Sequence, residues 1–376
     1  MSGGSSQAGE GGGAGGRRRS ALSVDPASGE SPPAVNPKRG PRRRRLTLDD
    51  YERGVLDGDR SVLGRAITLV ESTNATHNRA AQELLARLAG RTGGSTRVGI
   101  TGVPGVGKST FIDALGIRLT GDGRRVAVLA VDPSSGVSGG SILGDKTRMD
   151  RLAVDGRAYI RPSPSAGTLG GVAAKTRETM LLCEAAGFDV VIVETVGVGQ
   201  SETVVASMTD CFLALMLPGA GDELQGIKRG LIELADVLAV NKSDGDNQER
   251  AKLAANEYRH ALHYMQPREW GWRTKVLRCS AKTGEGLDDV WSAVLEHGRV
   301  AREAGAFGAW REQQSVDWMW RIVDDRVRTA LRTAPAVRSV VEEVESALRR
   351  GETTASLAAR RVLDALGVRD PEGDGA

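Results

Sequence analysis

Hydrophobic residues in the middle of the chain form short runs that alternate with helical patterns. Between about residues 95 and 299 these runs are strand-sized, and they are rich in Val and Leu on both faces. This composition is typical of strands that helices cover on both sides. The runs are RVGI (97–100), RVAVLAV (125–131), DVVIVE (189–194), CFLALML (211–217), DVLAV (236–240) and KVLRC (275–279). Their alternation with helices predicts an α/β fold with a doubly wound, mostly parallel sheet.

A helical pattern precedes this region. In residues 46–94 apolar side chains recur at helical spacing in three stretches, and Asp57-Gly58-Asp59 separates the first two. The stretches contain Leu48, Tyr51, Val55 and Leu56, then Val62, Ala66, Ile67 and Val70, and then Ala81, Leu84, Leu85 and Leu88. Spacing of three and four residues indicates amphipathic helices. We therefore expect an N-terminal helical extension over residues 46–94 and a central domain over residues 95–300.

A second helical pattern follows the central region. Residues 301–370 contain one apolar stripe at helical spacing and two shorter helical segments within 338–366. The stripe consists of Val316, Trp320, Val323, Val327 and Leu331. Trp310, Trp318 and Trp320 are expected in the core, because large aromatic side chains are more often buried than exposed. A helical surface paired between two subunits is the alternative interpretation.

The first 45 residues have the composition of a disordered tail. They contain nine Arg or Lys against three acidic residues, and the rest is largely Gly, Ser and Pro. Such a segment cannot bury enough apolar surface to offset its ordering entropy. Neither arginine run is followed by the apolar stretch of a secretory signal. A mitochondrial presequence is less favoured, because the tail has acidic residues and helix-breaking Gly and Pro. We expect a cytoplasmic protein.

Charge and cysteine content exclude several classes of protein. Outside the tail the chain carries 42 basic and 45 acidic residues, so a nucleic-acid-binding body is not expected. No apolar run approaches the roughly 20 residues of a membrane helix. Cys183, Cys211 and Cys279 are far apart in the sequence and form no CxxC pair, which favours reduced, buried thiols over a disulfide framework or a zinc site.

A phosphate-binding loop follows the first predicted strand. The sequence GVPGVGKST fits G-x-x-x-x-G-K-[ST] between a strand and the helical segment FIDALGIRL. The nucleotide-binding residues expected here are Gly102, Val103, Pro104, Gly105, Val106, Gly107, Lys108, Ser109 and Thr110. The glycines allow backbone N–H groups to face phosphate oxygens, and the helix N-terminus adds its positive dipole end. Lys108 is expected to reach the β- and γ-phosphates, and the Ser109 hydroxyl to bind Mg²⁺. A P-loop NTPase is therefore predicted.

Two later loops point to guanine. NKSD (241–244) follows the strand DVLAV, and CSAK (279–282) ends the last strand. The Asp244 carboxylate can accept hydrogen bonds from N1–H and the 2-amino group of guanine, whereas adenine offers neither donor. In the second loop a backbone N–H is expected to meet guanine O6. The base-site residues predicted are Asn241, Lys242, Asp244, Ser280, Ala281 and Lys282. GTP is favoured over ATP.

Acidic residues near two strand ends are candidates for the metal site. Asp132 follows one strand, and Asp145 lies in the loop after it, so both could approach Mg²⁺ directly or through water. Glu194 ends the neighbouring strand and forms ExxG with Gly197, where many GTPases have DxxG. Gly197 would let its N–H approach the γ-phosphate, so this turn is expected to sense the nucleotide.

The residue that positions the attacking water is not evident from the sequence. The position directly after Gly197 is valine, and Gln200 lies two positions further on. Gln200 is either a water-positioning residue or a structural residue of the switch. Because a positioned water is needed for hydrolysis, this arrangement predicts a slow catalyst that depends on a partner.

The motifs together resemble one family of GTPases. VDPSS…GDKTRM, ETVGVGQSE, PGAGDELQGIK, NKSD and SAK are similar to the GTPases that guard adenosylcobalamin-dependent acyl-CoA mutases. The resemblance is to the bacterial methylmalonyl-CoA mutase-associated GTPase and its human mitochondrial counterpart, and it covers about residues 46–366.

The resemblance implies a chaperone that forms homodimers through its C-terminal helical arm. Its slow GTP hydrolysis would be accelerated by the mutase and would gate the delivery of the cofactor. By position, 132–149 and 194–202 would be switches, and 219–228 a third mobile segment that contains Lys228. The cofactors expected are GTP or GDP and Mg²⁺. The sequence lacks the D-x-H-x-x-G pattern, so cobalamin is expected to bind the mutase and not this chain.

Three alternatives stay open. A nickel- or cobalt-insertion GTPase would be expected to show a His-rich tract or Cys/His ligands, which the sequence lacks. Sequences of this kind also carry the label of an ArgK- or LAO-type transport ATPase or kinase, and Asp244 argues against ATP. The third alternative is a nucleotide-dependent scaffold whose hydrolysis is incidental.

Overall fold

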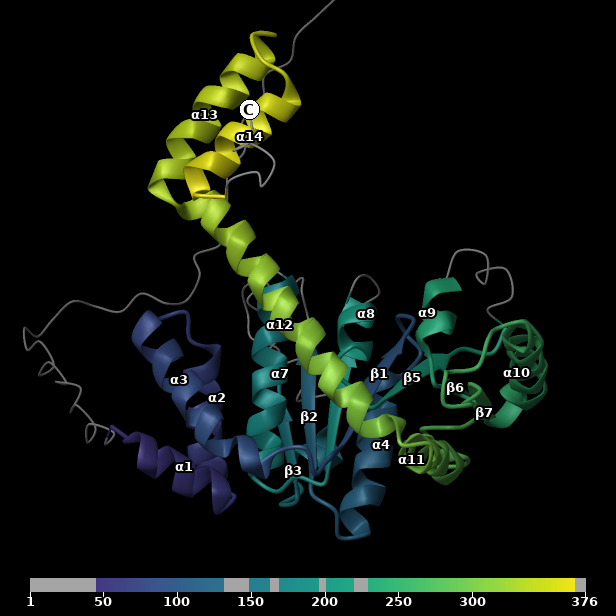
Figure 1. Ribbon diagram of the computed structural model, residues 1–376. Helices are drawn as coiled ribbons and strands as arrows, with labels where there is room; N and C mark the ends of the chain where they lie inside the picture. The colour runs from purple at the N-terminus through teal and green to yellow at the C-terminus, as the bar shows by residue number, and fades with distance from the viewer. Residues whose placement is uncertain (1–44, 132–148, 163–168, 196–200, 220–228, 369–376) are drawn as a thin grey trace, which may run out of the picture. The chain divides into compact units, whose positions relative to one another are not determined.

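A seven-stranded parallel β-sheet forms the centre of the structure (Figure 1). The structure is a computed structural model, and it describes residues 45–131, 149–162, 169–195, 201–219 and 229–368. The strands are β1 (Thr96–Gly102), β2 (Val126–Val131), β3 (Ala158–Arg161), β4 (Val190–Thr195), β5 (Cys211–Met216), β6 (Val237–Val240) and β7 (Lys275–Arg278). Their order is β3-β2-β4-β1-β5-β6-β7, and every neighbouring pair is parallel. The predicted α/β fold is confirmed, and the sheet is parallel throughout its described strands.

Strand β3 was missed by the sequence analysis. It is four residues long, and three of them are only partly buried. It pairs with β2 at the end of the strand order. A short edge strand needs no apolar run on both faces, so its sequence AYIR does not stand out from the flanking loop.

Helices cover both faces of the sheet. In chain order they are α1 (Leu48–Leu56), α2 (Arg60–Glu71), α3 (Ala75–Leu88), α4 (Lys108–Gly121), α6 (Asp150–Ala153), α7 (Leu169–Ala185), α8 (Ser201–Ala206), α9 (Arg229–Leu234), α10 (Gln248–His263), α11 (Leu287–Glu303), α12 (Ala306–Thr333), α13 (Pro335–Arg349) and α14 (Ala355–Leu366). Short 3₁₀ turns cover Ala89–Arg91 (η1) and Gly245–Asn247 (η3).

Two hydrophobic cores lie on opposite faces of the sheet. Along β2, Val126 and Val128 face the core formed with α4 and α11, while Ala127 and Leu129 face the core formed with α1–α3, α7 and α10. Successive residues of a strand point to opposite faces. The apolar runs seen in the sequence are therefore explained by burial on both sides.

Local capping determines where the N-terminal helices α1 and α2 begin. Thr47 and Asp50 form a reciprocal capping box at the start of α1. Gly58 has φ +70°, which ends the first helix in the left-handed region, and Asp59 then caps α2 through the N–H groups of its first turn. The Asp57-Gly58-Asp59 break predicted from the sequence is confirmed.

The arm helix α12 begins beside the sheet. Arg311 donates to both carboxylate oxygens of Asp210, at 2.7 and 2.6 Å, and Gln314 Nε2 donates to the carbonyl of Thr209 at 2.9 Å. Helices α13 and α14 pack against each other and against α12. Although α12 has 28 residues, no helix among the described residues is long and apolar enough to cross a membrane.

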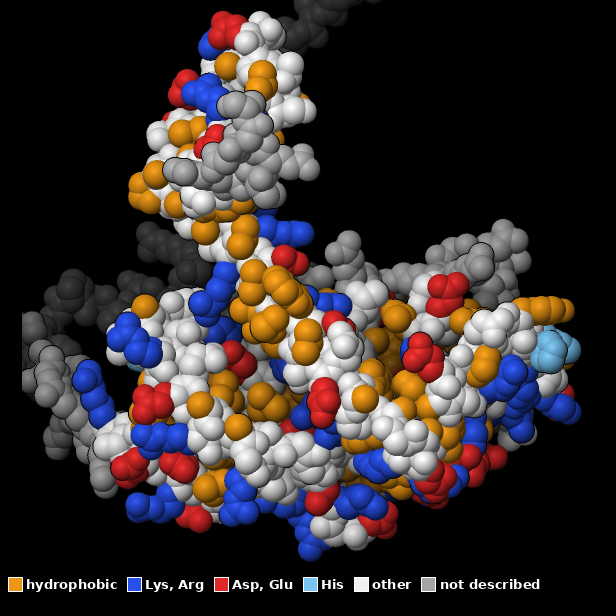
Figure 2. Space-filling model, viewed as in Figure 1, with side chains coloured by type: hydrophobic (Ala, Val, Ile, Leu, Met, Phe, Trp, Pro, Cys, Tyr) orange, Lys and Arg blue, Asp and Glu red, His pale blue; other side chains and the backbone are white. Residues whose placement is uncertain are grey.

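Helix α12 carries the three tryptophans that were predicted in the core, and Trp310 among them is half-buried. Trp318 is buried at 8% exposure, but Trp320 is 58% exposed, so the core prediction is wrong for Trp320. Three other residues of the stripe, Val316, Val323 and Val327, are also exposed, as is Met319 beside them, whereas Leu331 is half-buried. Figure 2 shows hydrophobic side chains gathered along α12. The alternative interpretation, a surface that pairs with another subunit, is the one that this exposure favours.

The three cysteines are free and buried, as predicted. Burial raises the pKa of Cys183 and of Cys279 to about 12, so both thiols remain protonated near neutral pH. The division of the chain at residues 45/46, 94/95 and 300/301 stays a prediction.

Candidate functional site

The loop between β1 and α4 has the conformation that its glycines were expected to allow. Gly105 and Gly107 have φ of +77° and +90°, in the left-handed region. A Cβ at Gly102 would lie 2.5 Å from the carbonyl oxygen of Leu215 on the neighbouring strand β5. The backbone therefore turns tightly at the carboxyl end of β1, and only glycine fits at its first position.

Helix α4 begins where this loop ends. Gly107 is its N-cap, and it has no side chain that could satisfy the first N–H groups of the helix. An anion is favoured there by these donors and by the positive end of the helix dipole. Lys108 Nζ donates to the carbonyl of Gly102 at 2.8 Å, which holds the ammonium group over the loop. Of the remaining loop residues, Val103 and Val106 are buried, whereas Pro104 and Thr110 are exposed.

Asn241 joins this loop to the two predicted base loops. Its Nδ2 donates to the carbonyl of Val106 at 2.8 Å, and its Oδ1 accepts from the N–H of Ala281 at 3.0 Å. The side chain is 1% exposed. Asn241 was predicted as a nucleotide-binding residue, and the structure places its amide between three loops of the protein.

Asp244 and Ser280 meet at the other side of these loops. The Ser280 hydroxyl donates to Asp244 Oδ1 at 2.7 Å and accepts from the N–H of Thr283 at 3.1 Å. Asp244 is half-buried at the start of η3, which leaves part of its carboxylate accessible. Lys242, at φ +58°, and Lys282 are both exposed beside it. The two base loops predicted from distant motifs are therefore adjacent.

The phosphate loop and Glu194, the glutamate predicted to bind the metal, also come together. Ser109 Oγ donates to Glu194 Oε1 at 3.2 Å, and Glu194 is 5% exposed. The register places Glu194 between Ile100 of β1 and Ala130 of β2. A hydroxyl and a carboxylate at this distance are hard oxygen donors that fit a Mg²⁺ ion.

Several predicted site residues cannot be placed. Asp132, Asp145, Gly197, Gln200 and Lys228 lie outside the described residues. Strand β2 ends at Val131, which pairs with Thr195 of β4, so the chain leaves β2 next to Glu194.

One feature of the site was not found from the sequence. Thr195 Oγ1 donates to Thr101 Oγ1 at 2.9 Å, and both side chains are fully buried at the carboxyl ends of β4 and β1. The bond ties the end of the Glu194 strand to the start of the phosphate loop. A threonine in two apolar strands is the only sequence signal, and threonine is common in strands for other reasons.

The carboxyl ends of β1, β4, β6 and β7 thus lie at one edge of the sheet. Ligands of open parallel sheets bind at the carboxyl ends of the strands, where the order of the strands reverses. Here the chain runs from β1 outward to β2 and β3, returns to β4 and then continues to β5 on the other side of β1. The arrangement can hold phosphates at one end and a base at the other.

Comparison with known proteins identifies relatives over most of the chain. Residues 63–336 match the family model described as methylmalonyl Co-A mutase-associated GTPase MeaB. A putative GTPase of Caulobacter vibrioides is 58% identical over 86% of this chain and 99% of its own length. The GTPase ArgK of Escherichia coli is 49% identical over 75% of this chain and 85% of its own.

A mammalian relative and a solved structure agree with this match. The mouse methylmalonic aciduria type A homolog, mitochondrial, is 45% identical over 86% of this chain and 80% of its own. A crystal structure described as a LAO/AO transport system kinase is 37% identical, covers 86% of this chain and all of that chain, and superposes with a TM-score of 0.70. The chain therefore belongs to the family of methylmalonyl-CoA mutase-associated GTPases and is a P-loop GTPase.

Proposed function

We propose that this protein binds and hydrolyses GTP with Mg²⁺ as a chaperone of an adenosylcobalamin-dependent acyl-CoA mutase. GTP binding is proposed because Asn241 connects the P-loop to the loop that contains Ser280, whose hydroxyl bonds to Asp244. The mutase part rests on the name of the family that the chain belongs to.

Asp244 selects guanine in this proposal. Its carboxylate is oriented by the Ser280 hydroxyl, which leaves acceptor capacity for the N1–H and 2-amino donors of the base. Adenine would place an unprotonated N1 against the carboxylate, which is unfavourable. Lys242 and Lys282 are both exposed in the two base loops, so their stems would be available to pack against the base.

The phosphates and the metal occupy the other end of the site. Backbone N–H groups of the P-loop and of the start of α4 would bind the phosphate oxygens together with the ammonium of Lys108. Ser109 and Glu194 would hold Mg²⁺, and Asp132 and Asp145 are the further ligands predicted from the sequence. When bound there, the ion neutralises charge on the β- and γ-phosphates. Ser109 would turn its hydroxyl oxygen from Glu194 toward the ion.

Hydrolysis is proposed to be slow without a partner. Gly197 would bring its N–H to the γ-phosphate, and Gln200 would either position water or support the switch. Lys228 would lie near the nucleotide or the partner. Ser201, the first residue of α8, and Glu202 are buried at the end of the proposed 194–202 switch, so a change in its turn would shift a packed helix.

The mutase would hold the cobalamin, and this chain would gate its loading and protect the enzyme. Relatives named as methylmalonic aciduria type A homologs are consistent with methylmalonyl-CoA as the substrate of the mutase. The bacterial relatives support a cytoplasmic location over a mitochondrial matrix. No nucleic acid or membrane partner is proposed.

One alternative has an observation in its favour. The solved relative described as a LAO/AO transport system kinase keeps an ATPase or kinase of a transport system open. Asp244 favours GTP, and the base preference separates the two. A metal-insertion GTPase is a weaker alternative, because nothing in the comparisons with high identity points to it.

We also propose that the chain forms a homodimer through α12. The exposed stripe of Val316, Met319, Trp320, Val323 and Val327 is continuous along one helix. Apolar stripes of this kind are covered by another surface in stable proteins, and a second copy presents the same stripe.

Asp244→Asn tests guanine recognition. Loss of the carboxylate should cost roughly 1–3 kcal/mol of GTP affinity relative to ATP, because one partner of a charged hydrogen-bonded pair is removed. Xanthosine triphosphate, which carries a carbonyl in place of the 2-amino group, should gain affinity from the new amide donor. Calorimetric titration measures all three nucleotides, and Asp246→Asn, an exposed neighbour, is the control. An unchanged GTP preference would refute the role of Asp244.

GTP turnover with and without purified methylmalonyl-CoA mutase tests the chaperone role. The mutase should raise the steady-state rate of the wild type, while Lys108→Ala should bind GTP weakly and stay inactive in both assays. The same rate with and without mutase would contradict the gated chaperone and favour a GTPase that serves another partner.

Val323→Asp tests the dimer. A carboxylate on a stripe that the dimer would bury is expected to shift the protein from dimer to monomer in light-scattering measurements, because its charge loses water on assembly. Val154→Asp is the matched control, since Val154 is 85% exposed and lies outside the stripe. A wild type that is monomeric at all concentrations, or a variant that dimerises normally, would exclude this surface.

A further inference from the structure

Three buried polar side chains from distant segments lie close together at the amino ends of β5 and β6. Cys211 is the first residue of β5, Asp236 directly precedes β6, and His297 lies on α11. Their exposures are 1%, 2% and 0%. One ligand atom of each lies within 4.8 Å of the other two, and His297 Nε2 is 3.5 Å from Asp236 Oδ1. This cluster lies at the amino ends of β5 and β6, opposite the nucleotide edge.

The imidazole of His297 makes no well-formed hydrogen bond within the described part of the chain, although its Nε2 lies 3.5 Å from Asp236 Oδ1. Both of its ring nitrogens are buried, and neither has a hydrogen-bond partner there. Three indoles surround the ring, with centroids at 5.0 Å for Trp272, 5.9 Å for Trp310 and 6.1 Å for Trp270. Buried polar atoms without a partner are costly and uncommon. A ligand at Nε2 would remove that cost.

We propose that Cys211 Sγ, Asp236 Oδ1 and His297 Nε2 bind a divalent ion of the zinc class. One thiolate, one imidazole and one carboxylate form a donor set that suits Zn²⁺ and Co²⁺ and not Mg²⁺. Ligand bonds of about 2.0–2.1 Å in a tetrahedron place nitrogen and oxygen about 3.4 Å apart. The observed separation of 3.5 Å fits this geometry without moving either backbone. Binding forms a sulfur–metal bond and releases the thiol proton to solvent.

The carboxylate is already held in place for this role. Arg268 donates from Nε and Nη2 to Asp236 Oδ1, at 3.1 and 2.9 Å, and the N–H of Phe212 donates to Oδ2 at 2.9 Å. Hydrogen bonds of this kind orient ligating carboxylates in metal sites. The thiolate and carboxylate balance the charge of the ion. The Arg268 side chain is 38% exposed, so water solvates the guanidinium charge.

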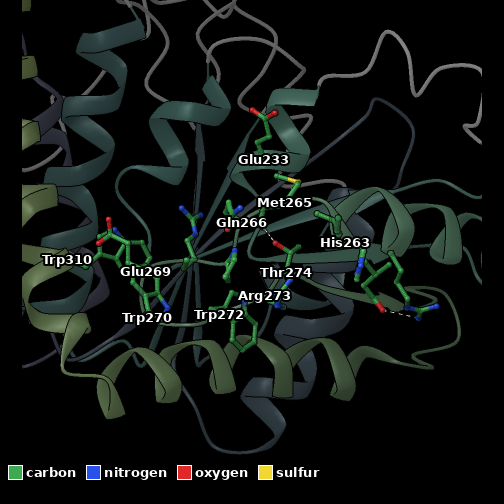
Figure 3. A pocket seen from close by; sticks show the side chains of 16 residues that line it. Glu233, His263, Met265, Gln266, Glu269, Trp270, Trp272, Arg273, Thr274 and Trp310 are labelled. Carbon is green, nitrogen blue, oxygen red and sulfur yellow. Dashed lines mark hydrogen bonds between the residues drawn. The ribbon is translucent and has the colours of Figure 1, made fainter.

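A cavity lies next to the aromatic residues that surround His297. Its volume is about 530 Å³, and Arg268, Trp270, Trp272 and Trp310 are among its lining residues. Figure 3 shows Trp270 and Trp310, whose centroids are 5.1 Å apart, side by side on one wall. His297 of the cluster packs against both indoles, and Asp236 accepts from Arg268 of the cavity lining. Because it is fully buried, the ion would fix β5, β6 and α11 together and would not be handed to a partner.

Cobalt titration of the full-length protein tests the site. The protein is stripped with chelator and titrated with Co²⁺ in the presence of excess Mg²⁺, which the thiolate site disfavours. The wild type should develop thiolate-to-cobalt charge-transfer absorption at a stoichiometry of about one ion per chain. Cys211→Ser should lose this band and bind the ion at least roughly tenfold more weakly. Cys183→Ser, another buried cysteine outside the cluster, should keep both.

Two further readouts keep the test decisive. GTP binding by each variant shows that it is folded, and His297→Asn replaces Cys211→Ser if the latter fails to fold. Zn²⁺ should raise the Tm of the wild type and of Cys183→Ser but not of the cluster variants. A folded wild type without the charge-transfer band, or equal metal binding by Cys211→Ser and Cys183→Ser, would overturn the proposal.

Discussion

The nucleotide site depends on the side-chain amide of Asn241. It donates to the P-loop at Val106 and accepts from the loop after β7 at Ala281, while its own backbone belongs to the loop after β6. One planar group therefore fixes three loops relative to one another. Because it is buried, water cannot replace either bond without cost. The distance between the phosphate end and the base end of the site is set before any ligand arrives.

The parallel sheet supplies the rest of the geometry. Register between β1, β2 and β4 places Glu194 beside the end of β1, and the Thr101–Thr195 bond holds those strand ends together. Glycine at position 102 then lets the P-loop pass close to β5. Strand pairing thus positions the P-loop and the Ser109–Glu194 pair, the groups that we propose hold the phosphates and the metal.

The opposite edge of the sheet carries buried charges that attach the arm. Arg97 donates to both oxygens of Glu184 at 2.8 Å, and the adjacent Asp210 is bound by Arg311 of α12. Loss of one partner from a buried pair typically costs about 3–5 kcal/mol. Gln314 donates to the carbonyl of Thr209, which follows α8 and the segment that we propose as a switch. The arm is therefore bonded to the residues that lead out of the proposed switch.

Sequence patterns predicted the elements whose residues are contiguous or regularly spaced along the chain. The P-loop, the base loops and six strands are continuous signals, so they could be found without a structure. Strand β3 was missed because an edge strand needs no long apolar run. Trp320 was misplaced because an apolar stripe does not reveal whether its own chain or another one covers it. The Cys211, Asp236 and His297 cluster has no signal at all in spacing, since the fold alone brings the three together.

The affinity of Asn241→Ala for GTP and GDP tests the central claim most directly. If the amide sets the spacing of the site, both affinities should fall by roughly tenfold or more, since two buried groups lose their partner. Asn256→Ala, an exposed asparagine on α10, should bind both nucleotides as the wild type does. A folded Asn241→Ala variant with wild-type affinity would contradict the account.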